Sequence, residues 1–147
     1  MKITEDVLRQ IQSHAERSYP EECCGVMLGV GPEDEPETQG IIEIDNSQEE
    51  NRKRRFLITP EQYRQAERDA TDRGLTLLGF YHSHPDHPAI PSAFDTEHAL
   101  PWLTYVIVSL AKGRATTTTA WLLRQDRGQF EELTLSILPA AGSRIRV

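Results

Sequence analysis

Residues 75–95, LTLLGFYHSHPDHPAIPSAFD, form the most informative stretch of this sequence for both fold and function. The run over residues 75–82 is almost wholly apolar, which is typical of a strand buried on both faces of a sheet. Residues 83–91 contain three prolines and no periodicity, so a loop is expected there. Ser92 is expected to open a short helix that ends before Pro101. The segment therefore predicts a strand, a loop and a helix in that order.

The sequence on either side predicts longer helices and further strands. Thr4 is a candidate N-cap for a helix of about 14 residues, with His14 on its exposed face. Thr59 is a second candidate N-cap, followed by Pro60 at the first helical position and by Gly74 at the helix end. Residues 31–40 are expected to form an acidic loop. The expected strands are residues 24–30, 41–44, 54–58, 104–110, 115–123 and 130–138.

This alternation of strands and helices predicts a single α/β domain with helices layered around one mixed, largely antiparallel sheet. Short connections join the last strands, so those strands must be antiparallel and a fully parallel, doubly wound sheet is not expected. The length of 147 residues fits one domain. We expect the domain to span residues 1–138 and residues 139–147 to form a flexible C-terminal tail.

The composition excludes several classes of protein. Hydrophobic residues make up 37% of the chain and charged residues 27%, which is a globular mixture. No apolar stretch approaches the roughly 20 residues of a membrane helix, and the acidic start lacks the apolar core of a signal peptide. Cys23 and Cys24 are neighbours and cannot form a disulfide framework. A cytoplasmic protein is therefore expected, with no membrane partner.

The net charge of −7 disfavours general binding to nucleic acid. One basic run, Arg-Lys-Arg-Arg at residues 52–55, could still bind an anionic partner locally. A solvated loop or strand edge is the alternative interpretation of the same run.

His82, His84 and Asp95 form a candidate metal site. Side chains two residues apart on a strand point to the same face, so both imidazoles can approach one ion. Two histidines and one carboxylate, with a fourth position left to water, are the ligand count of a catalytic zinc site. Other divalent ions accept the same donors. Taken separately, the His-x-His pair could be two packed histidines, and Ser-x-x-Asp could be an N-cap followed by an acidic residue. The order of the two patterns along the chain favours metal binding.

The pattern His-x-His-x7-Ser-x-x-Asp over residues 82–95 resembles the signature of the JAMM metalloproteases, the MPN+ branch of the Mov34/MPN family. Residues 20–29, PEECCGVMLG, resemble the family's other motif, in which an acidic residue precedes a buried strand. The resemblance covers residues 1–138. It implies the family's cytidine-deaminase-like α/β/α fold, one zinc ion per chain, and hydrolysis of amide bonds at the C-terminal tail of ubiquitin-like proteins.

The resemblance also implies a role for each matched residue. His82, His84 and Asp95 would be the zinc ligands. Glu22 would be the general base and then the general acid, and Ser92 would hydrogen-bond the substrate carbonyl or its oxyanion.

Some assignments stay open. Glu21 competes with Glu22 for the role of base, because neighbouring side chains of an extended segment point in opposite directions. Arg54, Arg55 and His87 are further candidates for contact with the substrate.

Small, stand-alone members with this kind of site resemble prokaryotic enzymes that process ubiquitin-like sulfur-carrier proteins. Such enzymes remove an amino acid, such as cysteine, from the Gly-Gly end of the carrier. The resemblance implies a carrier of this kind as substrate and partner. Two alternatives stay open: a deubiquitinase-like isopeptidase that acts on conjugated chains, and a non-catalytic MPN scaffold. A nucleic-acid partner is not expected.

Overall fold

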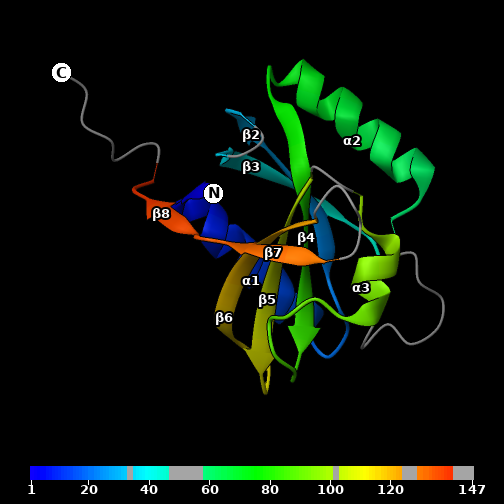
Figure 1. The fold of residues 1–147 in the computed structure, drawn as a ribbon, viewed down its shortest axis with the longest axis vertical. Coiled ribbons are helices and arrows are strands. Elements are labelled where there is room, and N and C mark those ends of the chain that lie inside the picture. Colours follow the sequence, from blue (N-terminus) through cyan, green and yellow to red (C-terminus); the bar gives the residue numbers. More distant parts are fainter. Residues whose placement is uncertain (33–34, 47–57, 101–102, 124–128, 141–147) are drawn as a thin grey trace.

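The computed structural model describes residues 1–32, 35–46, 58–100, 103–123 and 129–140. Within these residues one mixed sheet has the strand order β7-β6-β5-β4-β2-β3-β1-β8, and three helices pack on it (Figure 1). The strands are β1 (Lys2–Thr4), β2 (Cys24–Val30), β3 (Glu37–Ile44), β4 (Thr76–Pro85), β5 (Thr104–Ala111), β6 (Arg114–Leu123), β7 (Phe130–Leu133) and β8 (Ser136–Leu138). The helices are α1 (Glu5–Ser18), α2 (Pro60–Asp72) and α3 (Ala93–His98).

The sheet separates two hydrophobic cores. On one face, α1 contributes Val7, Ile11 and Ala15 to a cluster that includes Met27 and Tyr81 from the strands. On the other face α2 packs over a second cluster, whose buried members are Val26, Leu28, Ala66, Ala70, Phe80, Ala99, Tyr105 and Leu123. Figure 1 shows α1 behind the sheet and α2 and α3 along its other side. The helices therefore cover both faces, as the predicted α/β/α layers require.

The pairing within the sheet is mixed. β4 lies in its interior, antiparallel to β2 and parallel to β5, while β5 and β6 form an antiparallel pair. The parallel pair approaches closely at Gly79, where a Cβ atom would lie 1.8 Å from the carbonyl oxygen of Thr104. Only glycine fits at this point. The prediction of a mixed, largely antiparallel sheet is confirmed.

Several predicted strands have different bounds in the structure. The strand expected at residues 130–138 is two strands, β7 and β8, at opposite edges of the sheet. β8 pairs with β1, a short parallel partner that has too few residues to show a period in the sequence. β3 begins at Glu37, inside the predicted acidic loop, because its first residues pair with both β2 and β1. Of the strand expected at residues 54–58, all but the last residue lies outside the described part of the chain.

The predicted loop at residues 83–91 begins too early. β4 continues to Pro85, since residues 83–85 pair with residues 108–110 of β5. His84 is therefore a strand residue, and its position is held from β5.

Both predicted N-caps begin helices, but they differ in their contacts. Thr59 accepts a hydrogen bond from the backbone N–H of Gln62 at 3.1 Å in a complete capping box. Thr4 precedes α1 without a side-chain cap hydrogen bond. His14, expected on the exposed face of α1, is instead buried, with Nδ1 2.7 Å from the hydroxyl oxygen of Tyr81.

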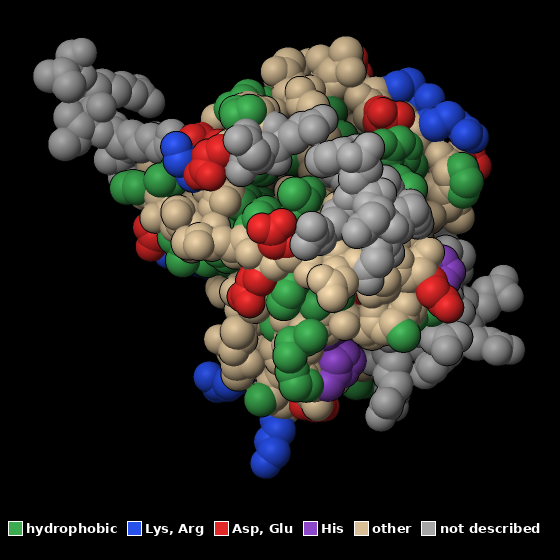
Figure 2. Space-filling model, in the orientation of Figure 1, with side chains coloured by type: hydrophobic (Ala, Val, Ile, Leu, Met, Phe, Trp, Pro, Cys, Tyr) green, Lys and Arg blue, Asp and Glu red, His purple; other side chains and the backbone are tan. Residues whose placement is uncertain are grey.

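None of the described helices is long and apolar enough to cross a membrane. Figure 2 shows acidic and basic side chains interspersed on the visible face of the described residues. The basic run 52–55 and most of the predicted tail 139–147 lie outside the described residues. The proposed boundary at residue 138 stays a prediction.

Candidate metal centre

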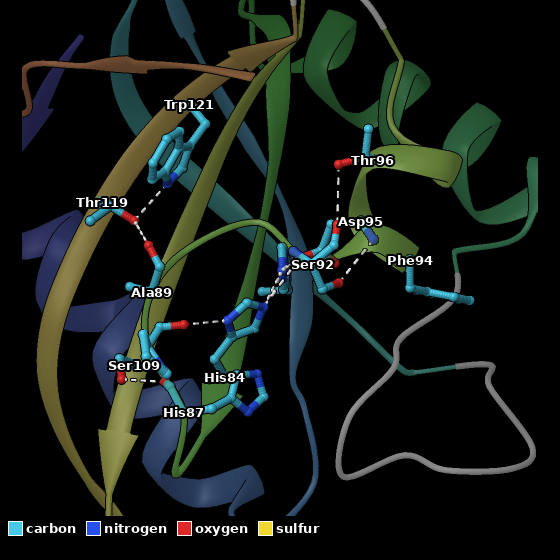
Figure 3. A network of polar contacts seen from close by, with 12 residues as sticks. His84, His87, Ala89, Ser92, Phe94, Asp95, Thr96, Ser109, Thr119 and Trp121 are labelled. Carbon is cyan, nitrogen blue, oxygen red and sulfur yellow. Dashed lines mark hydrogen bonds and ion pairs between the residues drawn. The ribbon is translucent and has the colours of Figure 1, made fainter. Parts of the chain in front are cut away.

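The structure brings the three predicted metal ligands together. The Nε2 atoms of His82 and His84 are 3.2 Å apart, and each lies 3.2 Å from Oδ2 of Asp95. All three side chains are buried. The two imidazoles come from the C-terminal half of β4 and the carboxylate from α3, so the site joins two segments (Figure 3).

The short helix α3 holds Asp95 by a capping box. The backbone N–H of Asp95 donates to Oγ of Ser92 at 3.0 Å, and the backbone N–H of Ser92 donates to Oδ2 of Asp95 at 2.8 Å. Oδ2 is the same oxygen that faces the two histidines. The predicted helix start at Ser92 is confirmed, and the cap orients the carboxylate toward β4.

A backbone contact orients the imidazole of His84. Nδ1 lies 2.7 Å from the carbonyl oxygen of Pro88, which can only accept a hydrogen bond. Nδ1 therefore carries the proton, and Nε2 presents its lone pair toward His82 and Asp95. This tautomer is the one that a metal ligand requires.

Hydroxyl groups on β5 and β6 fasten the loop between β4 and α3. Oγ of Ser109 donates to the carbonyl oxygen of His87 at 2.6 Å, and Oγ1 of Thr119 donates to that of Ala89 at 2.7 Å. The indole N–H of Trp121 donates in turn to Oγ1 of Thr119 at 2.8 Å (Figure 3). The loop is thus tied to the sheet at two points between the ligands.

The three donors fit a divalent metal ion. Ligands of a tetrahedral zinc ion, each about 2.0–2.1 Å from the metal, lie roughly 3.3–3.4 Å from one another. The observed triangle, 3.2 Å on each side, is close to that arrangement. Two neutral imidazoles and one carboxylate are also the chemistry that zinc accepts. His82, His84 and Asp95 are therefore the residues that would hold the ion.

Pairing with β4 places Glu22 beside the ligands. Cys24 pairs with His82 in the antiparallel ladder, and continuing this register by two residues places Glu22 across from His84. Ser83 extends the contact: its Oγ accepts from the backbone N–H of Cys23 at 2.8 Å, and its own N–H donates to the carbonyl oxygen of Cys23 at 3.2 Å.

The environments of the two candidate bases differ. Glu22 is only 2% exposed, and its Oε1 has no hydrogen-bond partner among the described residues. Glu21 is exposed to solvent. A buried carboxylate oxygen without a partner is costly unless a ligand, water or substrate satisfies it. Of the two, Glu22 is therefore the residue that the fold directs toward the site.

The pKa values of the two carboxyl groups of the site, Glu22 and Asp95, are shifted in opposite directions. Burial raises the pKa of Glu22 to about 8, against a smaller lowering by His84. Burial also acts to raise the pKa of Asp95, but the charge of His82, the side-chain contacts of His82 and His84 with the carboxylate, and the Ser92 N–H outweigh it and bring the pKa well below its usual value. A cation bound at the triangle would favour the ionised form of Glu22 as well.

A pocket of about 480 Å³ opens beside the metal ligands. Its walls are mostly apolar and come from α2, β4, α3 and the start of β5. The lining residues are Ile58, Thr59, Pro60, Tyr63, Arg64, Glu67, Phe80, His82, Phe94, Asp95, His98, Ala99, Leu100 and Tyr105. The sequence did not predict this pocket, because its residues are scattered over four segments and carry no common pattern.

Of the three candidates for contact with the substrate, the structure describes His87 alone. His87 is half-buried, and its ring packs on that of His84 with 4.1 Å between centroids. Arg54 and Arg55 lie outside the described residues. The roles assigned to Glu22, Ser92 and His87 stay predictions, although the fold brings Glu22 and His87 to the site.

Two curated relatives match much of the chain. A desampylase from Haloferax volcanii is 28% identical over 141 residues, which cover 93% of this chain and 96% of the relative. A probable TtuB-protein conjugate cleaving protease from Thermus thermophilus is 30% identical over 105 residues, which cover 71% of this chain and 67% of the relative.

Solved structures share the architecture. A solution structure of a protein from Salinibacter ruber is 42% identical, with a TM-score of 0.74, and the match covers 94% of this chain and 92% of the other. A crystal structure of a JAB1/MPN domain protein from Archaeoglobus fulgidus is 19% identical, with a TM-score of 0.57 and coverage of 94% and 96%. At that identity the second match supports the fold alone. The predicted MPN fold is confirmed.

A family model described as prokaryotic homologs of the JAB domain matches residues 4–124. The match spans most of the chain and includes both motifs from which the resemblance to JAMM/MPN+ proteins was inferred. That resemblance is confirmed, and the chain belongs to the family of prokaryotic homologues of the JAB domain.

Proposed function

We propose that this chain is a zinc metallopeptidase that hydrolyses the amide bond after the C-terminal Gly-Gly of a ubiquitin-like sulfur-carrier protein, releasing an amino acid such as cysteine. The observation that carries the proposal is the triangle of His82, His84 and Asp95, 3.2 Å on each side, beside the buried carboxylate of Glu22. The names of the two relatives, a desampylase and a probable conjugate cleaving protease, support a protein substrate.

One zinc ion per chain would be held by His82, His84 and Asp95. Bound zinc lowers the pKa of a coordinated water from 15.7 toward about 7 and polarises a carbonyl group. Glu22 would accept a proton from the attacking water and pass it to the departing amine. No covalent intermediate is required, so neither buried cysteine is needed as a nucleophile.

Ser92 has a proton to offer the substrate. Its Oγ already accepts the N–H of Asp95, so the hydroxyl hydrogen can be donated elsewhere. We assign that hydrogen to the substrate carbonyl oxygen, where negative charge develops during attack. Ser92 would thus cap α3 and stabilise the oxyanion with the same side chain.

The pocket supports an extended protein tail as the substrate. Its apolar walls reach His82 and Asp95, so it can receive an apolar side chain from the residues that precede the scissile bond. Glycines at the bond itself would let the substrate backbone approach the buried ligands closely.

We place the enzyme in the cytoplasm, where the free Cys23 and Cys24 remain reduced.

The names of the two relatives favour a second candidate function. Both names refer to the removal of modifiers from proteins, which suits an isopeptidase acting on conjugated chains. The same metal centre would serve that reaction, because an isopeptide and a peptide bond present the same carbonyl carbon to water.

The test compares substrates under one set of conditions. The protein is loaded with zinc, its metal content is measured, and it is incubated with a small carrier protein extended by cysteine after Gly-Gly. A matched carrier ending in Ala-Ala-Cys is the control, and mass spectrometry measures the release of cysteine. We expect cleavage of the Gly-Gly substrate alone.

Other results identify the alternatives. Cleavage of a lysine-linked carrier conjugate, with the cysteine-extended carrier left intact, would make the isopeptidase the function. A protein that retains no zinc and cuts neither substrate would instead be a scaffold.

A further inference from the structure

The chain reverses direction at Asp86, directly after β4. The backbone N–H of Asp86 donates to the carbonyl oxygen of Leu110 at 2.7 Å, near the C-terminal end of β5. The carbonyl oxygen of the next residue, His87, accepts instead from Ser109, one position earlier in that strand (Figure 3). Asp86 makes this reversal with a φ of 60°, in the left-handed region that residues other than glycine seldom adopt.

The reversal determines the orientation of a proposed metal ligand. Residues 87 and 88 return toward β4, and the carbonyl oxygen of Pro88 thereby reaches Nδ1 of His84 at 2.7 Å. That contact gives His84 its tautomer and directs Nε2 toward Asp95. The conformation of Asp86 therefore affects the metal centre, although Asp86 itself is exposed.

The carboxylate of Asp86 accepts hydrogen bonds from two other parts of the chain. The backbone N–H of Lys112, which also has a left-handed φ of 52°, donates to Oδ1 at 2.8 Å. The hydroxyl of Tyr19, the residue that ends α1, donates to Oδ2. Aspartate tolerates a left-handed conformation better than most residues, and its side chain here joins the turn to both neighbours.

The segment that carries Glu22 is fastened on both sides of that residue. On one side, the backbone N–H of Cys23 donates to Oγ of Ser83 at 2.8 Å. On the other side, three residues before Glu22, Tyr19 is bonded to Asp86. The first contact accompanies strand pairing, whereas the second consists of two side chains. Substitution can therefore remove the second contact and leave the strands paired.

We infer that Tyr19 and Asp86 are positioning residues, whose hydrogen bond holds the segment that carries Glu22 in place relative to His84. The effect on catalysis rests on the proposed function, in which Glu22 accepts the proton of the attacking water. A displacement of about 1 Å between reacting groups can lower a rate about 10²-fold. Because the Cys23 contact remains, we expect a smaller loss, of about tenfold, when the bond between Tyr19 and Asp86 is removed.

Two substitutions remove the bond in different ways. Tyr19→Phe removes the hydroxyl and keeps the ring, and Asp86→Gly removes the carboxylate while permitting the left-handed turn. With the carrier ending in Gly-Gly-Cys as substrate, kcat should fall about tenfold in each, and KM should stay within about twofold of the wild type. The double variant should lose no more than Asp86→Gly, because both substitutions break the same bond.

Asp86→Asn is the conservative variant that should restore function. Asparagine also adopts the left-handed conformation, and its Oδ1 can still accept from Lys112. Its amide N–H can donate to the hydroxyl oxygen of Tyr19, so the contact is kept with its direction reversed. We expect a kcat within about twofold of the wild type.

Glu16→Ala is the matched control for loss of stability. The exposed Glu16 accepts from the backbone N–H of Ala115 at 2.9 Å through Oε2, so it also joins α1 to another element by one hydrogen bond. That bond ends on β6 instead of on the turn at Asp86. Glu16→Ala should lower the Tm about as much as Tyr19→Phe and leave kcat and KM unchanged.

Hydrogen exchange at His84 gives a readout that needs no substrate. Nuclear magnetic resonance of the ¹⁵N-labelled protein, with and without zinc, follows the ring proton on Nδ1 that Pro88 holds. Exchange of this proton with water should be at least about tenfold faster in Tyr19→Phe and Asp86→Gly than in the wild type. Asp86→Asn and Glu16→Ala should exchange like the wild type.

Each contrary result has a distinct meaning. Wild-type exchange rates in both Tyr19→Phe and Asp86→Gly overturn the inference and leave the proposed function standing. Faster exchange with an unchanged kcat overturns the positioning of Glu22, as does an equal loss of kcat in Glu16→Ala. A wild type that hydrolyses no carrier substrate contradicts the proposed function, and the exchange rates then decide whether the bond holds the site.

Discussion

Glu21 and Glu22 are neighbours with opposite environments, and the difference follows from the strand that comes after them. Glu22 is buried and, by extension of the β2–β4 register, lies across from His84, whereas Glu21, the residue before it, is exposed to solvent. The sequence left two candidate bases, and burial distinguishes between them.

Replacing Glu22 tests that assignment. Glu22→Gln removes the proposed proton acceptor while keeping side-chain volume, so we expect zinc content to stay at one ion per chain and kcat to fall about 10²- to 10⁴-fold. Glu21→Gln is the matched control and should keep nearly wild-type kcat, because its side chain is exposed. Steady-state kinetics with elemental analysis measures both quantities. Near-normal turnover in Glu22→Gln would assign the proton transfer to another group.

His84 shows how one residue combines several constraints. Its backbone belongs to β4, its Nδ1 is held by Pro88, and its Nε2 faces Asp95 at 3.2 Å. The spacing of the two histidines predicts a shared face, but only the pairing of β4 with β5 determines that His84 is part of the strand.

At the scale of elements, the helix starts at Thr4 and Thr59 look alike in sequence and differ in contacts. Thr59 takes part in a reciprocal capping box with Gln62. The hydroxyl of Thr4 is buried and has no hydrogen-bond partner among the described residues. Two helix starts predicted by the same rule therefore differ in how much the threonine side chain stabilises the helix.

A pair of substitutions measures that difference. Thr59→Ala should lower the free energy of unfolding by about 1 kcal/mol, the usual effect of losing an N-cap. Thr4→Val keeps the shape and removes a buried hydroxyl, so it should change that free energy by less than about 0.5 kcal/mol or raise it. Urea denaturation of the zinc-loaded protein gives both values. A larger loss for Thr4→Val than for Thr59→Ala would show that the Thr4 hydroxyl is satisfied in solution.

At the scale of the whole molecule, the proposed ion would join parts that the chain otherwise connects only through a loop. Its ligands come from β4, in the interior of the sheet, and from α3 on one side of it. Binding to the folded state alone stabilises a protein by about 2.7 kcal/mol when the free ligand is 100 times its Kd. Metal content should therefore be visible in global stability.

Removal of zinc by a chelator should lower the Tm of the wild type by about 5–10 °C, since 1 kcal/mol corresponds to about 2–4 °C for a domain of this size. His84→Ala lacks one of the three proposed ligands and should unfold at the same temperature with and without chelator. Calorimetric scans at fixed protein concentration provide the measurement. An unchanged wild-type Tm, with zinc demonstrably removed, would mean that the ion does not couple to folding.

The fold class and the grouping of His82, His84 and Asp95 could be predicted because their signals are local. Apolar runs, turn residues and the His-x-His and Ser-x-x-Asp spacings each act within a few residues, where strand and helix periods determine direction. The helix starts at Thr59 and Ser92 and the strand at residues 24–30 were predicted for the same reason.

Only the tertiary structure determined the features that depend on contacts between residues far apart in the chain. β1 exists because β3 and β8 pair with it, and residues 130–138 divide because β7 and β8 meet opposite edges of the sheet. The burial of His14 depends on Tyr81, 67 residues away. The choice of Glu22, the approach of His87 and the apolar pocket likewise need the packed sheet, because contacts between segments far apart in the chain leave no period within either segment.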